Sequence, residues 1–395
     1  MVTKNYLTVN EFKNKKENLG TTYGVVVGKF YPLHKGHVDL IQKASSFVDH
    51  LFVVVSHSDK RDDKLFMDSK MKRPLTPKTK LKIVQKTFQM QRDIITPVLV
   101  DESNIPEYPN GWPEWSDLVK KAIFDHRSSN FNLEGLKTEN TFFFSSEPQD
   151  AQGYLDNFGF STVIVDEARE NVDISATRVR NDPASYWDYL PRASREELAP
   201  TIVIAGGESS GKTLMTDKLG NYFGTTTVWE YGRDYCNLEL GGDEGALQYS
   251  DYQNIANGHY QDVRYARRNA NRLVISDTDY VATQAFCLTY EGSSHPSVQD
   301  KIENDPFDLV ILLDNSTKWV DDGMRLIGDS DKRQAFQQLL KVLYEKNNIP
   351  YVEVKASSYY DRYELCKKII KKYIEEDTSV DSLQLYVDSV VGGKE

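Results

Sequence analysis

The sequence predicts an α/β protein made of two doubly wound parallel-sheet domains. Two apolar runs, at residues 23–28 and 201–205, each lead into a glycine-containing turn and then into a helical pattern, as a βαβ unit does. After each run, short apolar strands alternate with amphipathic stretches. Alternation of this kind is typical of an open parallel sheet with helices on both faces.

The expected elements follow this alternation in order. In the first domain we expect helices at 37–47, 79–88 and 115–125 and strands at 23–28, 51–55, 94–100, 141–144 and 162–165. In the second domain we expect a helix at 214–222 and strands at 201–205, 273–276, 309–313 and 351–354. The proline- and charge-rich stretch 183–200 predicts the boundary. We therefore expect a polar N-terminal arm at 1–22, domains at 23–190 and 200–378, and a C-terminal tail at 379–395.

Composition narrows the class of protein. Of the 395 residues 39% are hydrophobic, which is enough for two cores, and the net charge of −11 argues against nucleic acid as the main partner. The cysteines (Cys236, Cys287 and Cys366) are widely spaced and odd in number, which argues against a disulfide framework or a zinc site and fits a reducing cytoplasm. No apolar run is long enough to insert into a membrane.

The stretch GKFYPLHKGH at 28–37, here called the histidine motif, lies between an expected strand and an expected helix. Glycines allow a close backbone approach to phosphate, and a helix N-terminus adds N–H donors. His34 and His37 are three residues apart, so both can reach one phosphate group. Capping of the turn or packing against the sheet is the alternative.

The stretch NVDISATRVR at 171–180, here called the serine-arginine motif, places Ser175 and Thr177 at a helix start, with Arg178 and Arg180 behind them. Such a group can hold the β- and γ-phosphates of a nucleotide. A simple N-cap with a basic first turn is the alternative.

Together the two motifs resemble the nucleotidyltransferase patterns G-x-F-x-P-x-H-x-G-H and I-S-x-T-x-x-R. The resemblance implies in-line attack on the ATP α-phosphate, departure of pyrophosphate, and a requirement for Mg²⁺. It implies that His34 and His37 contact the phosphates, that Lys29 adds positive charge, and that Ser175, Thr177 and Arg180 clamp the departing group. The remaining nucleotide-binding residues implied by the motifs are Gly28, Phe30, Gly36 and Arg178. Trp112, in the Pro/Gly-rich stretch 108–115, is expected either to stack on a substrate ring or to pack in the core.

The stretch GGESSGKT at 206–213 matches the P-loop pattern G-x-x-x-x-G-K-[ST] in full and lies between a strand and a helix, as that motif requires. Lys212 is expected to neutralise the β/γ oxygens of ATP, and Thr213 to ligate Mg²⁺. The loop itself, expected to cradle the phosphates, contains Gly206, Ser209, Ser210 and Gly211.

Acidic and basic residues complete the expected second site. Asp277 ends a strand and is our candidate acid on the Mg²⁺ side, while Asp279 is either substrate-binding or a surface residue. Glu230 lies about twenty residues after the P-loop, where a base can take the acceptor proton, with Asp277 as the competing base. The adjacent candidates for substrate binding are Tyr231 and Arg233. The segment DDGMR ending at Arg325, followed by Arg333, is expected to be a lid over the phosphates, or else a solvated loop.

The order of these motifs, with GGDEGALQYSDY, ATQAFCLTYEG and HPSVQ, closely resembles NadR-type proteins over residues 22–375. That family joins a ribosylnicotinamide kinase to a nicotinamide mononucleotide adenylyltransferase. The resemblance implies that the second domain phosphorylates nicotinamide riboside with ATP and that the first domain converts nicotinamide mononucleotide and ATP to NAD and pyrophosphate. Some members carry an N-terminal helix-turn-helix domain, for which residues 1–22 leave no room, so we expect no DNA binding.

Two alternatives stay open at this point. In one, only the kinase turns over and the first domain is a nucleotide-binding sensor. In the other, the whole chain is a non-enzymatic sensor of NAD status that binds a transporter or regulator. The expected small-molecule partners are nicotinamide riboside, nicotinamide mononucleotide, NAD and ATP. The macromolecular partners considered are a nicotinamide riboside transporter and a second copy of the chain.

Overall fold

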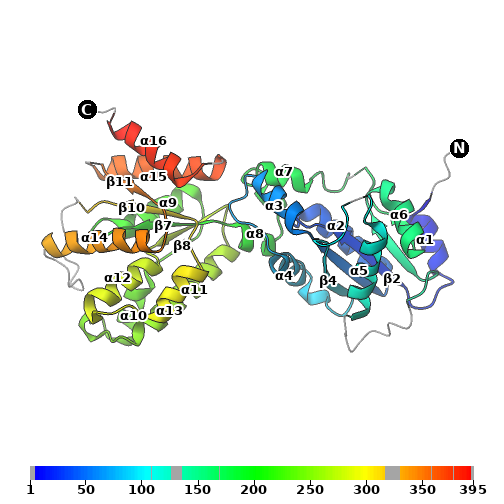
Figure 1. Cartoon of the computed structure of the whole chain (residues 1–395), viewed down its shortest axis with the longest axis horizontal. Coiled ribbons are helices and arrows are strands. Elements are labelled where there is room, and N and C mark those ends of the chain that lie inside the picture. Colours follow the sequence, from blue (N-terminus) through cyan, green and yellow to red (C-terminus); the bar gives the residue numbers. More distant parts are fainter. Residues whose placement is uncertain are drawn as a thin grey trace. The chain divides into compact units, whose positions relative to one another are not determined.

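The computed structural model describes residues 5–107, 109–125, 136–168, 170–315, 330–356, 358–376 and 378–392. The chain divides into two compact units between Glu197 and Leu198 (Figure 1). Each unit is an α/β domain with its own parallel sheet, as the sequence predicts.

In the described part of unit 1, the sheet has six parallel strands in the order β1-β6-β5-β2-β3-β4. The strands are β1 (Tyr6–Thr8), β2 (Tyr23–Gly28), β3 (His50–His57), β4 (Ile95–Asp101), β5 (Thr141–Ser145) and β6 (Ser161–Ile164). The helices are α1 (Val9–Lys16), α2 (Lys35–Phe47), α3 (Asp59–Met67), α4 (Pro77–Thr87), α5 (Trp112–Asp125), α6 (Ala151–Phe158), α7 (Ala176–Asn181) and α8 (Arg192–Leu198). Short 3₁₀ turns are η1 (Gln89–Gln91), η3 (Pro148–Asp150) and η4 (Trp187–Tyr189).

The prediction of a polar N-terminal arm is wrong for residues 6–16. β1 extends the sheet by pairing in parallel with β6, and α1 begins with a capping box between Thr8 and Glu11. Phe12 is fully buried, with its ring 4.9 Å from that of Phe142. Because one aromatic residue anchors an otherwise polar helix, the segment shows almost no helical periodicity in its sequence.

In the described part of unit 2, the sheet has five parallel strands in the order β11-β10-β7-β9-β8. The strands are β7 (Thr201–Ala205), β8 (Thr227–Val228), β9 (Val274–Asp277), β10 (Leu309–Leu313) and β11 (Tyr351–Val354). The helices are α9 (Lys212–Phe223), α10 (Tyr231–Glu239), α11 (Asp251–Arg268), α12 (Tyr280–Glu291), α13 (Pro296–Asn304), α14 (Ser330–Lys346), α15 (Tyr359–Glu375) and α16 (Val380–Gly392), with the 3₁₀ turn η5 (Glu244–Ala246).

The strands of unit 2 are apolar on both faces, because helices cover both. Ile202 and Ile204 pack with α9, α15 and α16, whereas their neighbours Val203 and Ala205 pack with α11, α12 and α14. Figure 1 shows α15 and α16 on one side of the sheet and α12 and α14 on the other. This arrangement leaves the carboxyl ends of the strands as the place where loops can bind a ligand.

The prediction of a C-terminal tail at 379–395 is also wrong, since residues 380–392 form α16. Leu383 and Val387 are buried in the core of unit 2, and Gln384 Oε1 accepts a 2.7 Å hydrogen bond from the Glu353 N–H of β11. The apolar residues of this segment recur at helical spacing, so its sequence does carry the signal of a packed helix.

None of the helices in the described ranges combines the length and the apolar character that a bilayer span needs.

Candidate active sites

The histidine motif turns sharply after β2. Phe30 has a positive φ of 46° and is buried, and its ring lies over Gly28, where a Cβ would be only 2.6 Å from it. Gly28 is therefore required by close packing within the loop itself. The chain then enters α2, with His34 as the N-cap residue.

The two histidines are held as a stacked pair at the N-terminus of α2. Each backbone N–H donates to the Nδ1 of the other ring at 3.4 Å, and the ring centroids are 3.7 Å apart. Because each Nδ1 accepts a hydrogen bond, a neutral ring carries its proton on Nε2, which makes Nε2 a donor. The capping role weighed as an alternative is thus present, and it presets both rings as donors at a helix N-terminus.

The serine-arginine motif meets the histidine motif in space. Arg180 donates from Nη1 to the Tyr31 carbonyl at 2.8 Å and from Nη2 to Thr177 Oγ1 at 2.9 Å. Ser175 caps α7 by accepting the Arg178 N–H at 3.3 Å. The structure therefore brings together two segments that are about 140 residues apart in sequence.

Three other predicted residues of unit 1 are Arg178, Lys29 and Trp112. The guanidinium of Arg178 pairs with Asp173 at 3.0 Å and stacks on Tyr186, and its side chain is 43% exposed. Lys29 is exposed and acts electrostatically on Asp150. Trp112 is not in a loop but begins α5.

The ring of Trp112 packs edge-on against Trp115 and Tyr154, with centroids 5.3 Å and 5.5 Å apart. The geometry therefore favours the core-packing alternative for Trp112 over stacking on a substrate.

Gly36 offers a test of the histidine pair. A Cβ at this position would lie 3.1 Å from the His34 ring and 3.3 Å from Ile174 Cγ2. Gly36→Ala should push the His34 ring by a few tenths of an ångström and lower pyrophosphate release from nicotinamide mononucleotide and ATP about tenfold. Gly20→Ala is the matched control, because nothing lies within 4 Å of its added Cβ. Equal rates for the two variants would contradict the expected role of the pair.

The P-loop of unit 2 has the backbone that phosphate binding needs. Gly206, Ser209 and Gly211 have positive φ values of 150°, 59° and 87°. These turns carry the chain from β7 to the start of α9, where Lys212 is the first helical residue and its Nζ donates to the Gly207 carbonyl at 3.3 Å. A loop of this shape directs successive N–H groups toward one anion.

Helix α14 braces the P-loop from behind. Gln337 Oε1 accepts the Gly207 N–H at 2.8 Å, and Arg333 Nε donates to the Glu208 carbonyl at 3.2 Å. Arg333 is buried in a helix, so its assignment to a mobile lid is wrong, and it holds the loop instead. Arg325, the other lid residue, lies outside the described residues. Gln337, one turn after Arg333, was missed because a helical glutamine gives no motif.

The acid at the end of β9 faces the P-loop helix. Thr213 Oγ1 donates to Asp277 Oδ2 at 2.6 Å. Burial, reinforced by nearby Glu230, raises the pKa of Asp277 to about 6, while Lys212 and Thr213 act in the opposite direction. A hydroxyl beside a buried carboxylate fits the usual P-loop arrangement for Mg²⁺, in which the remaining ligands are phosphate oxygens and water.

The P-loop opens onto a cavity of about 230 Å³, which we call the first cavity. Glu230 and Arg233 lie in its wall, with 3.7 Å between Glu230 Oε2 and Arg233 Nη2. The residues that line it are Glu208, Ser209, Gly211, Lys212, Thr213, Leu214, Glu230, Arg233, Glu244 and Phe286. Three carboxylates, two cations and a phosphate-binding loop therefore surround one space.

A second cavity continues beyond this wall and shares Glu230, Arg233, Glu244 and Phe286 with the first. Three tyrosines and one phenylalanine are among its lining residues, and Tyr231 is one of them. A Cβ at Gly258 would lie 2.0 Å from the Tyr231 ring. Further lining residues that the sequence did not suggest are Cys236, Leu247, Tyr252, Ile255, His259, Thr278, Thr283 and Tyr290. Six of them come from α10, α11 and α12, whereas Leu247 and Thr278 lie just before α11 and α12, so their common position depends on helix packing.

Asp279 does not line either cavity. Its carboxylate caps α12 by accepting the Ala282 N–H at 2.9 Å and also accepts the Tyr344 hydroxyl at 2.8 Å. The candidate role in substrate binding is therefore wrong, and so is the alternative of a surface residue, because Asp279 is only 2% exposed. Its position two residues past the end of β9 and directly before α12 suits a helix cap equally well.

Asp279 should make stability depend on pH. Burial raises its pKa from the ordinary 3.8 to about 6, so the folded chain binds this proton more tightly than the unfolded chain. The free energy of unfolding should fall by about 2 kcal/mol between pH 4 and pH 6 for this group alone. Asp279→Asn should remove this pH-dependent fall in the free energy of unfolding. In urea unfolding, the variant should therefore be more stable than wild type at pH 7.5 but not at pH 4.5. A variant less stable at pH 7.5 would contradict it.

Comparison with known proteins gives the same two-part division. The cytidylyltransferase-like family model matches residues 25–182, and an AAA domain model matches residues 201–362. Crystal structures of NadR protein with NR, and with NAD and AMP-PNP, have TM-scores of 0.72 and 0.70 at 22% identity. Both alignments cover 95% of this chain, and they cover 100% and 99% of the respective solved chains. The solved proteins therefore share the fold of this chain.

The curated relatives are closer in sequence. The trifunctional NAD biosynthesis/regulator proteins NadR of Salmonella typhimurium and Escherichia coli are each 43% identical to this chain over 366 residues. Each alignment covers 93% of this chain and 86% of the relative. The chain, with its nucleotidyltransferase-like and P-loop units, therefore belongs to the NadR family of NAD biosynthesis proteins.

Proposed function

We propose that this chain makes NAD from nicotinamide riboside in two ATP-dependent steps, one in each unit. The observation that carries the proposal is the pair of adjacent cavities in unit 2. The P-loop lines the first, three tyrosines are among the residues that line the second, and Glu230 lines both. Relatives bearing the NadR name have been crystallised with NR, with NAD and with AMP-PNP, which supports the choice of substrates. The buried free cysteines fit a reducing cytoplasm as the location.

The first step is phosphorylation of the riboside 5′-hydroxyl. Glu230 takes the hydroxyl proton, the oxygen attacks the γ-phosphorus of ATP, and ADP leaves. Lys212 and the loop N–H groups stabilise the charge on the transferring phosphoryl group. Glu230 is the better base because it lines both cavities, whereas Asp277 is hydrogen-bonded to Thr213. Mg²⁺ would be held through Thr213 and Asp277 and would neutralise phosphate charge.

The second step is adenylyl transfer in unit 1. A phosphate oxygen of nicotinamide mononucleotide attacks the α-phosphorus of ATP in line, and pyrophosphate leaves with no covalent enzyme intermediate. The Nε2–H donors of His34 and His37 stabilise charge at the reacting phosphate. Ser175, Thr177 and Arg180, which lie beside the histidine motif, bind the departing pyrophosphate.

Mass spectrometry of the products from nicotinamide riboside and MgATP tests the proposal directly. We expect nicotinamide mononucleotide and ADP first, then NAD and pyrophosphate. Accumulation of nicotinamide mononucleotide without NAD would favour the kinase-only alternative. Binding of ATP and NAD without any product would favour a non-enzymatic sensor, and the proposal would be wrong.

A further inference from the structure

Two tyrosines that line the second cavity have buried hydroxyls with no hydrogen-bond partner among the described residues. Tyr252 of α11 is 1% exposed, and both it and Tyr290 of α12 line the cavity. Neither hydroxyl oxygen is exposed, and neither has a hydrogen-bond partner within the described ranges. A buried hydroxyl without a partner costs free energy, so a site of this kind points to a ligand that completes the bonding.

Both phenols are protonated donors. Burial, with carboxylates nearby, raises the pKa of Tyr252 and of Tyr290 well above the ordinary value of 10. Each hydroxyl can therefore donate one hydrogen bond and also accept one at any physiological pH. A primary carboxamide has the matching pattern, because its oxygen accepts and its NH₂ group donates.

The charged residues that line the second cavity favour a cationic ligand over an anionic one. Its lining includes the carboxylates Glu230 and Glu244, and Arg233 is the one Lys or Arg among the described lining residues, lying 3.7 Å from Glu230. Aromatic rings of Tyr231, Tyr252, Phe286 and Tyr290 complete the wall. Aromatic faces and carboxylates favour a flat cation, and a buried anion here would be repelled.

We propose that Tyr252 and Tyr290 bind the carboxamide of the acceptor's pyridinium ring and so make the kinase select an amide-bearing, positively charged nucleoside. The acceptor ring lies in the second cavity, with its 5′-hydroxyl directed to the first. The carboxylate analogue, nicotinic acid riboside, is excluded because its negative charge would face Glu230 and Glu244. This assignment rests on the proposed kinase function and deepens it.

The test compares three acceptors: nicotinamide riboside, N-ribosylpyridinium without the carboxamide, and nicotinic acid riboside. For wild type, kcat/KM should be highest for nicotinamide riboside. Tyr252→Phe and Tyr290→Phe should each lower kcat/KM for nicotinamide riboside about tenfold, mainly through KM. The same substitutions should leave kcat/KM for N-ribosylpyridinium almost unchanged. The double variant should therefore have similar kcat/KM values for nicotinamide riboside and N-ribosylpyridinium.

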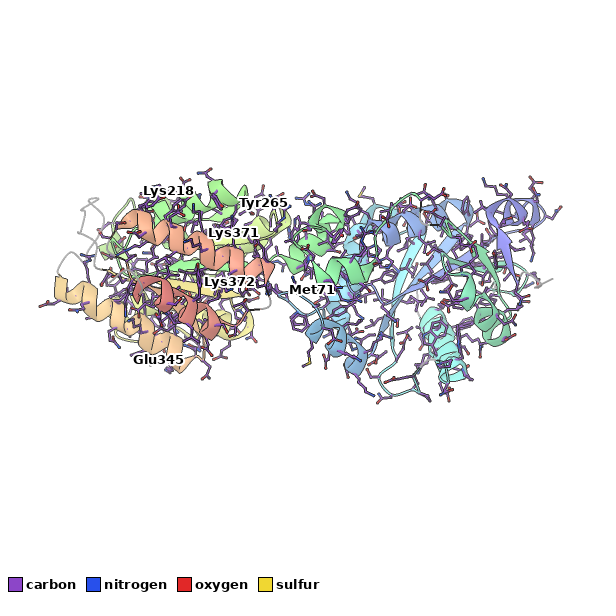
Figure 2. All side chains as sticks on the ribbon, turned by 90° about the horizontal axis from the view of Figure 1, so that it is seen from above. Met71, Lys218, Tyr265, Glu345, Lys371 and Lys372 are labelled. Atoms are coloured by element: carbon purple, nitrogen blue, oxygen red, sulfur yellow. The ribbon has the colours of Figure 1, made fainter. Side chains whose placement is uncertain are left out.

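A stability readout separates binding from a structural role. Removing an unsatisfied buried hydroxyl should leave the Tm of the ligand-free protein unchanged or raised. Tyr265→Phe is the matched control, since Tyr265 is on α11 as well but is 68% exposed (Figure 2). Its kinetics should equal those of wild type.

Three outcomes would overturn the assignment while leaving the kinase function intact. One is an equal loss of kcat/KM for nicotinamide riboside and N-ribosylpyridinium, which would show that the tyrosine hydroxyls bind the ribose. Another is wild-type kinetics in the double variant. The third is efficient use of nicotinic acid riboside by wild type. If wild type phosphorylates none of the three acceptors, the proposed function itself fails.

Discussion

Lys212→Ala is expected to lower the rate of phosphoryl transfer to nicotinamide riboside by about a thousandfold. Lys212 lies at the start of α9 and lines the first cavity, and within the P-loop its ammonium group bonds the Gly207 carbonyl. Because a charge at this place acts chiefly on the transferring phosphoryl group, we expect the loss in kcat rather than in KM for the acceptor. The measurement is ADP formation at saturating MgATP.

Lys218→Ala is the matched control for this variant. Lys218 belongs to the same helix, is exposed, and lies over the Tyr359 ring at 4.8 Å (Figure 2). Its kinase rate should stay within about twofold of wild type, because surface substitutions of this kind rarely perturb a site. Wild-type phosphorylation by the Lys212 variant would show that the kinase site has been placed wrongly.

His34→Ala should reduce pyrophosphate release from nicotinamide mononucleotide and ATP by at least about a hundredfold, with kinase turnover unchanged. The variant loses the His34 Nε2 donor and also the Nδ1 acceptor that positions the backbone of His37. Both effects fall on the adenylyl-transfer site. Supplying nicotinamide riboside and nicotinamide mononucleotide in separate assays measures the two activities independently.

His50→Ala serves as the control for the histidine variant. His50 begins β3, at the opposite end of the sheet from the histidine motif, and stacks on Tyr23 with centroids 5.6 Å apart. We expect normal pyrophosphate release from it. A His34 variant that still forms NAD at the wild-type rate would exclude the histidine pair from the reaction.

The strands were predictable because each unit buries its sheet on both faces. The apolar runs at 23–28, 201–205, 309–313 and 351–354 coincide with β2, β7, β10 and β11. Such continuous apolar runs can be recognised from the local sequence alone, without knowing which strands they pair with. α1 could not be found in this way, because Phe12 is its one buried residue and most of the rest of the helix is polar.

The phosphate-binding loops were predictable for a different reason. A backbone that encloses phosphate needs glycines at fixed spacing, and that requirement is local in sequence. Tyr252 and Tyr290 carry no such local signal, since α11 and α12 bring them together only after folding. Arg333 was misjudged because the sequence DDGMR ending at Arg325 predicts a mobile loop, whereas the helix that includes Arg333 begins at Ser330.

The pairing of β1 with β6 has a practical consequence for anyone who expresses this protein. A clone that started near residue 20, chosen because the preceding residues look dispensable, would leave the β6 edge without its partner and uncover the rings of Phe142 and Phe144. Open strand edges beside apolar surface invite self-association. An affinity tag is therefore best separated from Tyr6 by a spacer, with the first turn of α1 left intact.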